Sequence, residues 1–255
     1  MIIPDGFEFK NNENVDFKVQ LLTNNDQPLK GIRVAFEDLC PSKGDCDLND
    51  VVVDFQYQVV TDATNRTKDI KSKYKLKAAC CVFRNGFSEE LSFNVSELAS
   101  LSGNGLGIEA GSKVILKVHS NSKVNTSGDN TLIGVKYTET ETINRAITLS
   151  NSKNITKGNF NPLIYVDEPG KGRGYEVHLT GQTPASLDSS AVLGTNADAT
   201  TPSKEIYYKT RNNLPFAIAI PERFASLAKN GGSKYTDWYQ NNSGYRNANK
   251  FCIKP

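Results

Sequence analysis

The sequence has little of what several common functional classes require. Its 255 residues include one tryptophan, one methionine, two histidines and five cysteines, and they contain no Cys-x-x-Cys pair. Neither His119 nor His178 lies in a spacing typical of zinc ligands, so we expect no structural zinc site. No apolar run is long enough to span a bilayer, and residues 1–5 do not resemble a signal peptide. If the protein is exported, its signal must precede this sequence.

An excess of charge of one sign is also absent. The chain has 30 basic and 28 acidic residues, and no block of like charge indicates nucleic acid or an anionic membrane as a partner. A row of lysines, Lys71, Lys73, Lys75 and Lys77, alternates with other residues along one expected strand. Nucleic-acid binding is one interpretation of this row. A solvated face, or protection of a sheet edge, explains it better.

Motifs of common enzymes are missing as well. The sequence has no Gly-x-Ser-x-Gly elbow, no His-Glu-x-x-His helix and no phosphate-binding loop. Glu176 and His178 lie two apart on an expected strand and so share a face, where they can orient a base or form an ordinary hydrogen-bonded pair. We expect the second and predict that the protein is not an enzyme. A glycan-processing enzyme stays open, because the separation of paired carboxylates depends on the fold.

The composition favours strands joined by turns. Val, Ile, Thr, Tyr and Phe are plentiful, and Asn, Ser and Gly recur at short intervals. Asn85-Gly86 lies between two β-like runs and predicts a type I′ hairpin. Strands are expected at 15–21, 31–36, 51–60, 70–78, 81–83, 87–93, 114–119, 131–137, 143–149, 160–166, 175–179 and 206–209. A short apolar run at 216–220 ends at Pro221.

These runs predict an all-β fold, a jelly-roll-like antiparallel β-sandwich with short helices near the C-terminus. The helices are expected at 221–228 and 236–239. Residues 1–30 form a leading segment that continues from an upstream region or joins the sandwich, and residues 31–255 form the sandwich domain. Side chains expected to share one core are Val53, Phe55, Tyr57, Tyr74 and Leu76.

An acidic segment precedes the strand that begins at Val51. Its oxygen-bearing side chains are Glu37, Asp38, Asp45, Asp47, Asn49 and Asp50, with Asp54 further along the strand as a reserve. Alternate side chains of a coiled loop can converge and offer a hard cation such as Ca²⁺ several oxygens. The segment is not an EF-hand, because such a loop needs Gly at position six and Glu at position twelve. The alternative is a tight turn closed by Asx side chains.

The cysteines allow two interpretations. Cys40 and Cys46 flank the acidic segment, and a disulfide between them would limit how far it opens in the unfolded chain. Cys80 and Cys81 are neighbours and face opposite sides of an expected strand, so at most one of them belongs to the core. Alternatively, the cysteines are buried thiols that pack as small apolar residues.

Several motifs occur together in a known order. They are Phe36-Glu37-Asp38-Leu39, Gly44-Asp45-Cys46-Asp47-Leu48-Asn49-Asp50-Val51-Val52-Val53-Asp54, Asn85-Gly86-Phe87, Asn161-Pro162-Leu163-Ile164, Glu176-Val177-His178-Leu179, Leu214-Pro215-Phe216-Ala217-Ile218 and Asp237-Trp238-Tyr239. In these motifs the chain resembles the LruC-domain family of surface and envelope lipoproteins of Bacteroidetes and Leptospira. It departs from that family at Cys46, where an aromatic is usual, and at Phe216, where Trp is common.

The resemblance implies a secreted or outer-membrane surface location, usually behind a lipidated cysteine that this sequence lacks and that an upstream sequence would supply. It implies no established activity. A similar acidic motif in other secreted β domains is taken as calcium-binding. We therefore predict a non-catalytic envelope module, structural or adhesive, whose acidic loop binds Ca²⁺ and whose partner is a surface glycan or a protein ligand. As an alternative, Trp238, Tyr239 and Tyr207 would form the platform of a carbohydrate-binding module.

Overall fold

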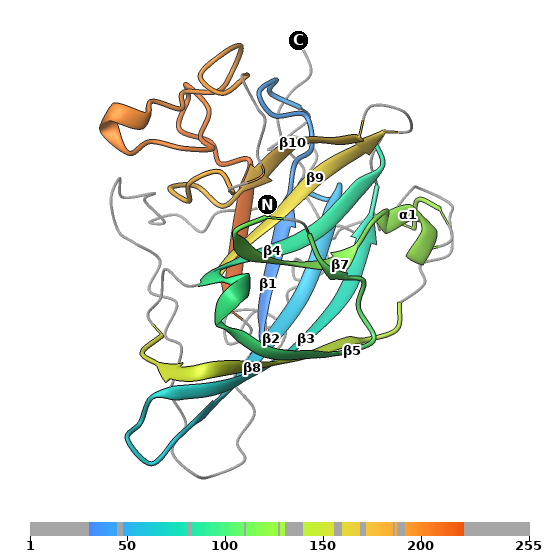
Figure 1. Ribbon diagram of the computed structural model, residues 1–255. Helices are drawn as coiled ribbons and strands as arrows, with labels where there is room; N and C mark the ends of the chain where they lie inside the picture. Colours follow the sequence, from blue (N-terminus) through green and yellow to red (C-terminus); the bar gives the residue numbers. More distant parts are fainter. Residues whose placement is uncertain are drawn as a thin grey trace, which may run out of the picture.

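The computed structural model describes residues 31–44, 48–80, 83–109, 111–126, 128–130, 140–155, 160–168, 172–185, 187 and 192–221. Within these ranges the chain forms two antiparallel sheets that lie one over the other (Figure 1). Sheet A has the order β11 (Ala217–Pro221), β1 (Ile32–Phe36), β2 (Val51–Thr61), β3 (Thr67–Ala79), β8 (Ile143–Lys153) and β5 (Leu98–Gly103). Sheet B has the order β10 (Gly172–His178), β9 (Phe160–Glu168), β4 (Asn85–Asn94), β7 (Lys113–His119) and β6 (Gly107–Ile108).

The predicted antiparallel sandwich is therefore confirmed. Helical structure in the described part of the chain is limited to short pieces, α1 (Ser122–Asn125), η1 (Val95–Glu97) and η3 (Pro202–Lys204). None of the helices described is long and apolar enough to cross a membrane. The leading segment 1–30 and the helices expected at 221–228 and 236–239 fall outside the described residues, apart from Pro221, which ends β11.

The core lies between the two sheets and follows from the alternation along each strand. In β2, the buried residues Val51, Val53, Phe55, Tyr57 and Val59 alternate along the strand. Gln56 and Gln58, which lie between them, are partly exposed. The five predicted core residues, Val53, Phe55, Tyr57, Tyr74 and Leu76, all belong to one buried cluster. Their rings pack in tilted and edge-to-face pairs, which aromatic quadrupoles favour.

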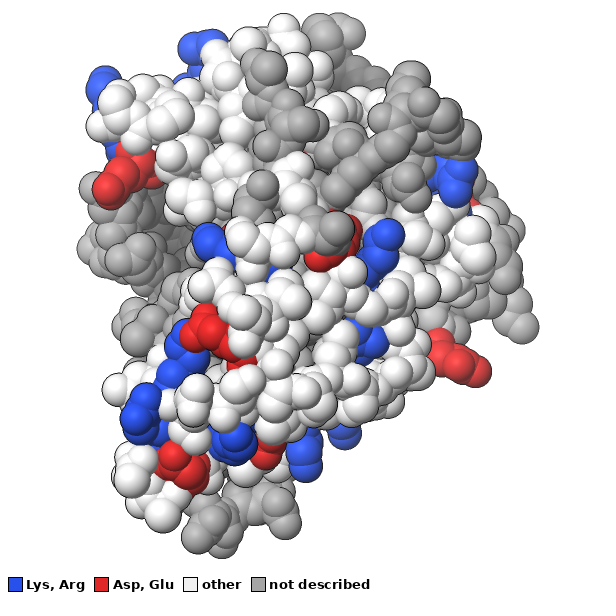
Figure 2. All heavy atoms as spheres, viewed as in Figure 1, with Lys and Arg blue, Asp and Glu red and all other residues white. Residues whose placement is uncertain are grey.

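The lysine row lies on β3, which is a central strand of sheet A between β2 and β8. Protection of a sheet edge is therefore the wrong explanation for it. Lys71 and Lys73 are exposed and line a hollow of about 250 Å³ on the outer face of the sheet, whereas Lys77 is buried. On the face of the molecule shown in Figure 2, basic and acidic atoms lie close together, and no large area carries one sign.

The hairpin predicted at Asn85-Gly86 is wrong. Both residues belong to β4, where they pair with Val166 and Tyr165 of β9. Packing explains the glycine, because a Cβ atom at Gly86 would lie 2.2 Å from Cζ of Tyr165. The Asn-Gly pair therefore marks a close approach of a ring to the backbone rather than a turn.

Two further differences concern short segments. No strand forms at 206–209, where Tyr208 has a φ of 51° and only isolated bridges connect Ile206 to Thr201 and Lys209 to Pro215. Conversely, β5 and β6 were not predicted from the sequence. The glycine-rich segment from Gly103 to Gly107 ends β5 and begins β6. The exposed positions of β5 carry Ala and Ser, so the alternation that reveals other strands is weak there.

One carboxyl group lies inside the main core. Glu89 is fully buried on β4, in the same alternating phase as Phe87, Leu91 and Phe93. The hydroxyl of Tyr74, on the opposite sheet, donates a hydrogen bond to Oε2 of Glu89, while Oε1 has no partner in the described chain. Burial raises the pKa of Glu89 well above its ordinary value, because the charged form loses its hydration.

Replacement of Gly86 by alanine tests the close approach to Tyr165. We expect Gly86→Ala to lower the free energy of unfolding by about 1–3 kcal/mol, since the added methyl group forces the ring to move. Chemical denaturation measures the change. Combining it with Tyr165→Leu should give a loss smaller than the sum of the single losses, and full additivity would contradict the contact.

Replacement of Glu89 by glutamine tests the buried carboxyl group. Because the pKa of Glu89 is raised in the folded state, its protonated carboxyl group contributes to the stability of the fold. This contribution is fully present below the unfolded pKa of about 4.3 and is lost as pH rises. Glu89→Gln should therefore be more stable than the wild type at pH 7 and should lose that advantage near pH 4. Denaturation of both proteins across this range gives the difference. A difference independent of pH would contradict the assignment.

Candidate metal centre

The acidic cluster, defined here as Glu37, Asp38 and Asp50, forms where β1 leads into β2. Antiparallel pairing places Phe36, the last residue of β1, opposite Val51, the first residue of β2. The acidic residues directly after Phe36 and directly before Val51 therefore meet at one end of sheet A. The backbone N–H of Glu37 also donates to the carbonyl of Phe216, 2.8 Å away, just before β11.

The three carboxyl groups of the cluster lie close enough to share one ion. Each offers an oxygen within 4.8 Å of the others, and the residues are only 2%, 3% and 7% exposed. The N–H of Asp38 donates to Oδ2 of Asp50 at 2.8 Å, and Nδ2 of Asn85 donates to Oδ2 of Asp38 at 2.6 Å. Oxygen ligands alone favour Ca²⁺ or Mg²⁺ over Zn²⁺.

The electrostatics of the cluster are unfavourable without a positive charge. Burial, the negative charges of Asp38 and Glu37, and a side-chain hydrogen bond with Glu37 raise the pKa of Asp50 to about 11. The hydrogen bond from the Asp38 N–H acts in the opposite direction and does not compensate. A bound cation would relieve the repulsion that these groups exert on one another.

The structure brings together half of the six predicted metal ligands. Asn49 is buried in the same loop, whereas Asp45 and Asp47 fall outside the described residues. The loop nevertheless reaches the cluster, because a Cβ atom at Gly44 would lie 2.3 Å from Oε1 of Glu37. Gly44 has a φ of 64°, a conformation that glycine adopts readily.

Asp54 does not belong to the acidic cluster, and the predicted disulfide cannot be followed because one of its cysteines is outside the described residues. Asp54 forms a two-contact ion pair with Arg33, at 2.6 and 2.9 Å, so the reserve ligand already has a cationic partner. Cys40 is buried in the main core. Its predicted partner Cys46 lies outside the described residues, and the disulfide stays a prediction.

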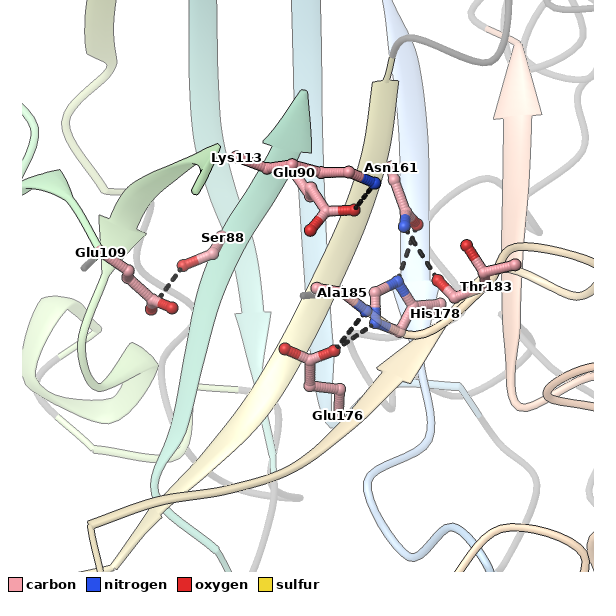
Figure 3. A network of polar contacts seen from close by, with 9 residues as sticks. All are labelled: Ser88, Glu90, Glu109, Lys113, Asn161, Glu176, His178, Thr183 and Ala185. Carbon is pink, nitrogen blue, oxygen red and sulfur yellow. Dashed lines mark hydrogen bonds and ion pairs between the residues drawn. The ribbon is translucent and has the colours of Figure 1, made fainter. Parts of the chain in front are cut away.

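A second polar network covers the outer face of sheet B. Figure 3 shows Glu176 and His178 turned toward each other on β10, with Asn161 of β9 on the other side of the imidazole. His178 Nε2 lies 2.8 Å from Oε2 of Glu176, and its Nδ1 lies 2.7 Å from Oδ1 of Asn161. The N–H of Ala185 also donates to Oε2 of Glu176 at 2.9 Å, and Nδ2 of Asn161 donates to the carbonyl of Thr183 at 3.0 Å.

This network has the form of a structural support. The expected hydrogen-bonded pair of Glu176 and His178 is present, and both side chains are fully buried. Each ring nitrogen of His178 is engaged, and the ring lies 4.9 Å from the buried ring of Tyr208. The pair anchors the segment from Thr183 to Ala185, and it leaves no nitrogen of the imidazole for a substrate.

Of the three residues predicted to form an aromatic platform, the structure describes Tyr207. Tyr207 is partly buried and packs against the main core, as most such aromatics do. Trp238 and Tyr239 lie outside the described residues. Tyr207 alone does not form a flat surface for a sugar.

Comparisons with known proteins give a family and a structural likeness. A family model described as Domain of unknown function (DUF4842) matches residues 65–239, a range that begins after the acidic cluster. A crystal structure described as a "Putative lipoprotein from Bacteroides ovatus" is similar at 15% identity and a TM-score of 0.45, over 83% of this chain and 73% of that one. A search of curated proteins gave no match.

Replacement of His178 by leucine tests the structural support. The change leaves Oδ1 of Asn161 buried without its partner, which costs about 1–3 kcal/mol. It also removes one hydrogen bond of Oε2 of Glu176, which keeps the N–H of Ala185. Urea denaturation should show this loss. Lys113→Met, which removes a half-exposed ion pair to Glu90 at 3.5 Å, should cost at most about 1 kcal/mol. Equal effects of the two changes would contradict the buried network.

Proposed function

Since the chain belongs to the family described as Domain of unknown function (DUF4842), we propose a function from its own residues: it is a non-catalytic module of the cell envelope whose acidic cluster binds Ca²⁺. The carrying observation is the convergence of the Glu37, Asp38 and Asp50 carboxyl groups within 4.8 Å at the β1–β2 junction. Three carboxyl groups buried together are costly unless they are protonated or share a cation.

Calcium fits this set of ligands better than a transition metal. The cluster consists of carboxyl oxygens, and Asn49 in the same loop adds a further oxygen-bearing side chain. Ca²⁺ takes six to eight oxygen ligands in flexible geometry, which a loop can supply together with two strand ends. In the proposal, Asp45 and Asp47 complete the set from the acidic loop.

The ion has a structural role in this proposal. The three acidic residues are at most 7% exposed, so a substrate has little access to an ion held between them. The cluster also joins strands rather than facing the hollow on sheet A. A cation there would stabilise the connection between β1 and β2 and the approach of β11.

The location and the finer family follow from the resemblance of the sequence motifs. We propose an LruC-type domain, held at the outer surface of the cell envelope by a lipid anchor upstream of this sequence, where it has a structural or adhesive role. The absence of a membrane-crossing helix among the described residues is compatible with such an anchor. The glycan platform is not proposed, because Tyr207 packs against the core.

Calcium titration tests the proposed site. At about one hundred times its dissociation constant, calcium should add about 2.7 kcal/mol to the free energy of unfolding, and chelator should remove this gain. The double change Glu37→Gln with Asp50→Asn should raise the melting temperature of the metal-free protein, since it removes repulsion, and should abolish the calcium-dependent increase. Asp45→Ala with Asp47→Ala should weaken the increase through the loop.

A surface carboxylate provides the control for this experiment. Glu97 forms an exposed ion pair with Lys153, so Glu97→Gln removes one negative charge far from the proposed ligands. This variant should keep the full calcium-dependent increase. An unmoved wild-type melting curve, together with no heat of binding in calorimetry, would show that the acidic segment is an Asx-rich turn.

A further inference from the structure

Asn85 comes from sheet B and lies against the acidic cluster of sheet A. It is the first residue of β4 and is fully buried, and its backbone pairs with Val166 of β9. Its Nδ2 donates to Oδ2 of Asp38 at 2.6 Å. The amide therefore reaches across the sandwich to a carboxyl group that follows β1.

The other end of this amide has no hydrogen-bond partner. Oδ1 of Asn85 is buried, and no described residue donates a hydrogen bond to it. A buried polar atom without a partner costs about 1–3 kcal/mol and requires an explanation. Because Oδ1 and Nδ2 share one amide carbon, this oxygen lies in the same part of the core as the carboxylate of Asp38.

We propose that Oδ1 of Asn85 is a ligand of the cation, so that the ion joins the two sheets of the sandwich. The inference rests on the proposed calcium site and adds to it a ligand from the opposite sheet. Amide carbonyl oxygens are common Ca²⁺ ligands beside carboxylates. An ion beside Asp38 would give the Asn85 oxygen the positively charged partner that it lacks.

Neighbouring packing holds the two sheets together at this point. Phe36, directly before Glu37, meets Phe87 of β4 edge to face, with ring centroids 6.1 Å apart. The ligands from the two sheets are therefore held near each other by apolar contacts before an ion binds. A buried site that offers several protein oxygens favours Ca²⁺ over Mg²⁺, which retains several of its waters.

The test measures calcium binding by calorimetry and by the change in melting temperature between calcium chloride and chelator. Asn85→Ala should weaken calcium binding about 10-fold or more. Asn85→Asp should lower the melting temperature of the metal-free protein, because it adds a fourth buried carboxylate, and should enlarge the increase caused by calcium. A purely structural amide would show the first effect of Asn85→Asp without the second. Magnesium chloride should give a smaller increase than calcium chloride.

Ser88→Ala is the matched control. Ser88 is also buried on β4, and its hydroxyl donates to Glu109 at 3.2 Å, about 10 Å along the strand from Asn85. It should leave calcium affinity unchanged. If the wild type binds calcium and Asn85→Ala binds it equally well, the inference fails and the proposed site stands. If the wild type binds no calcium, the proposed site fails as well. Should Asn85→Ala not fold, the two melting temperatures of Asn85→Asp decide the question.

Discussion

The pairing of β1 with β2 is the constraint on which the candidate site depends. Their register places Phe36 opposite Val51, and this brings residues twelve positions apart, Asp38 and Asp50, into contact. The hydrophobic effect sets the register, because Val34 and Phe36 of β1 and Val51 and Val53 of β2 must all face the core. A shift by one residue would expose these side chains and separate the acids. The core thus provides the free energy that holds three acidic side chains together.

The strands were predictable where burial differs between the two faces of a strand. β2 and β3 have such a difference, and their side chains alternate in the sequence. Prediction failed where local signals compete with packing across the sandwich. Asn85-Gly86 has the composition of a turn, but the ring of Tyr165 and the carboxyl group of Asp38 determine its role. Tyr208 lies in a β-like run but adopts a φ of 51°, with its ring against His178.

The acidic cluster was predictable in part, because its residues lie at the ends of two strands that the sequence reveals. Acidic residues at a strand end and before the next strand can be paired from the sequence alone once the two strands are assumed to be neighbours, as Glu37, Asp38 and Asp50 show. The hydrogen bond from Asn85 to Asp38 could not be predicted, because it depends on how sheet B lies over sheet A. The same holds for Glu89, whose charge gives no indication that the strand turns it into the core. Contacts between the two sheets can be identified only when the three-dimensional packing is known.

The pairing of β1 with β11 has a consequence for how the protein is made. β11 (Ala217–Pro221) completes sheet A beside β1 (Ile32–Phe36), although most of the chain lies between them. During synthesis from the N-terminus, the backbone N–H and C=O groups on that side of β1 lack their strand partner until β11, the last strand of the described chain, has been made. An open strand edge invites pairing with other chains, and contacts distant in sequence form slowly. Truncation before Ala217 would thus leave this edge of β1 open to pairing with other chains.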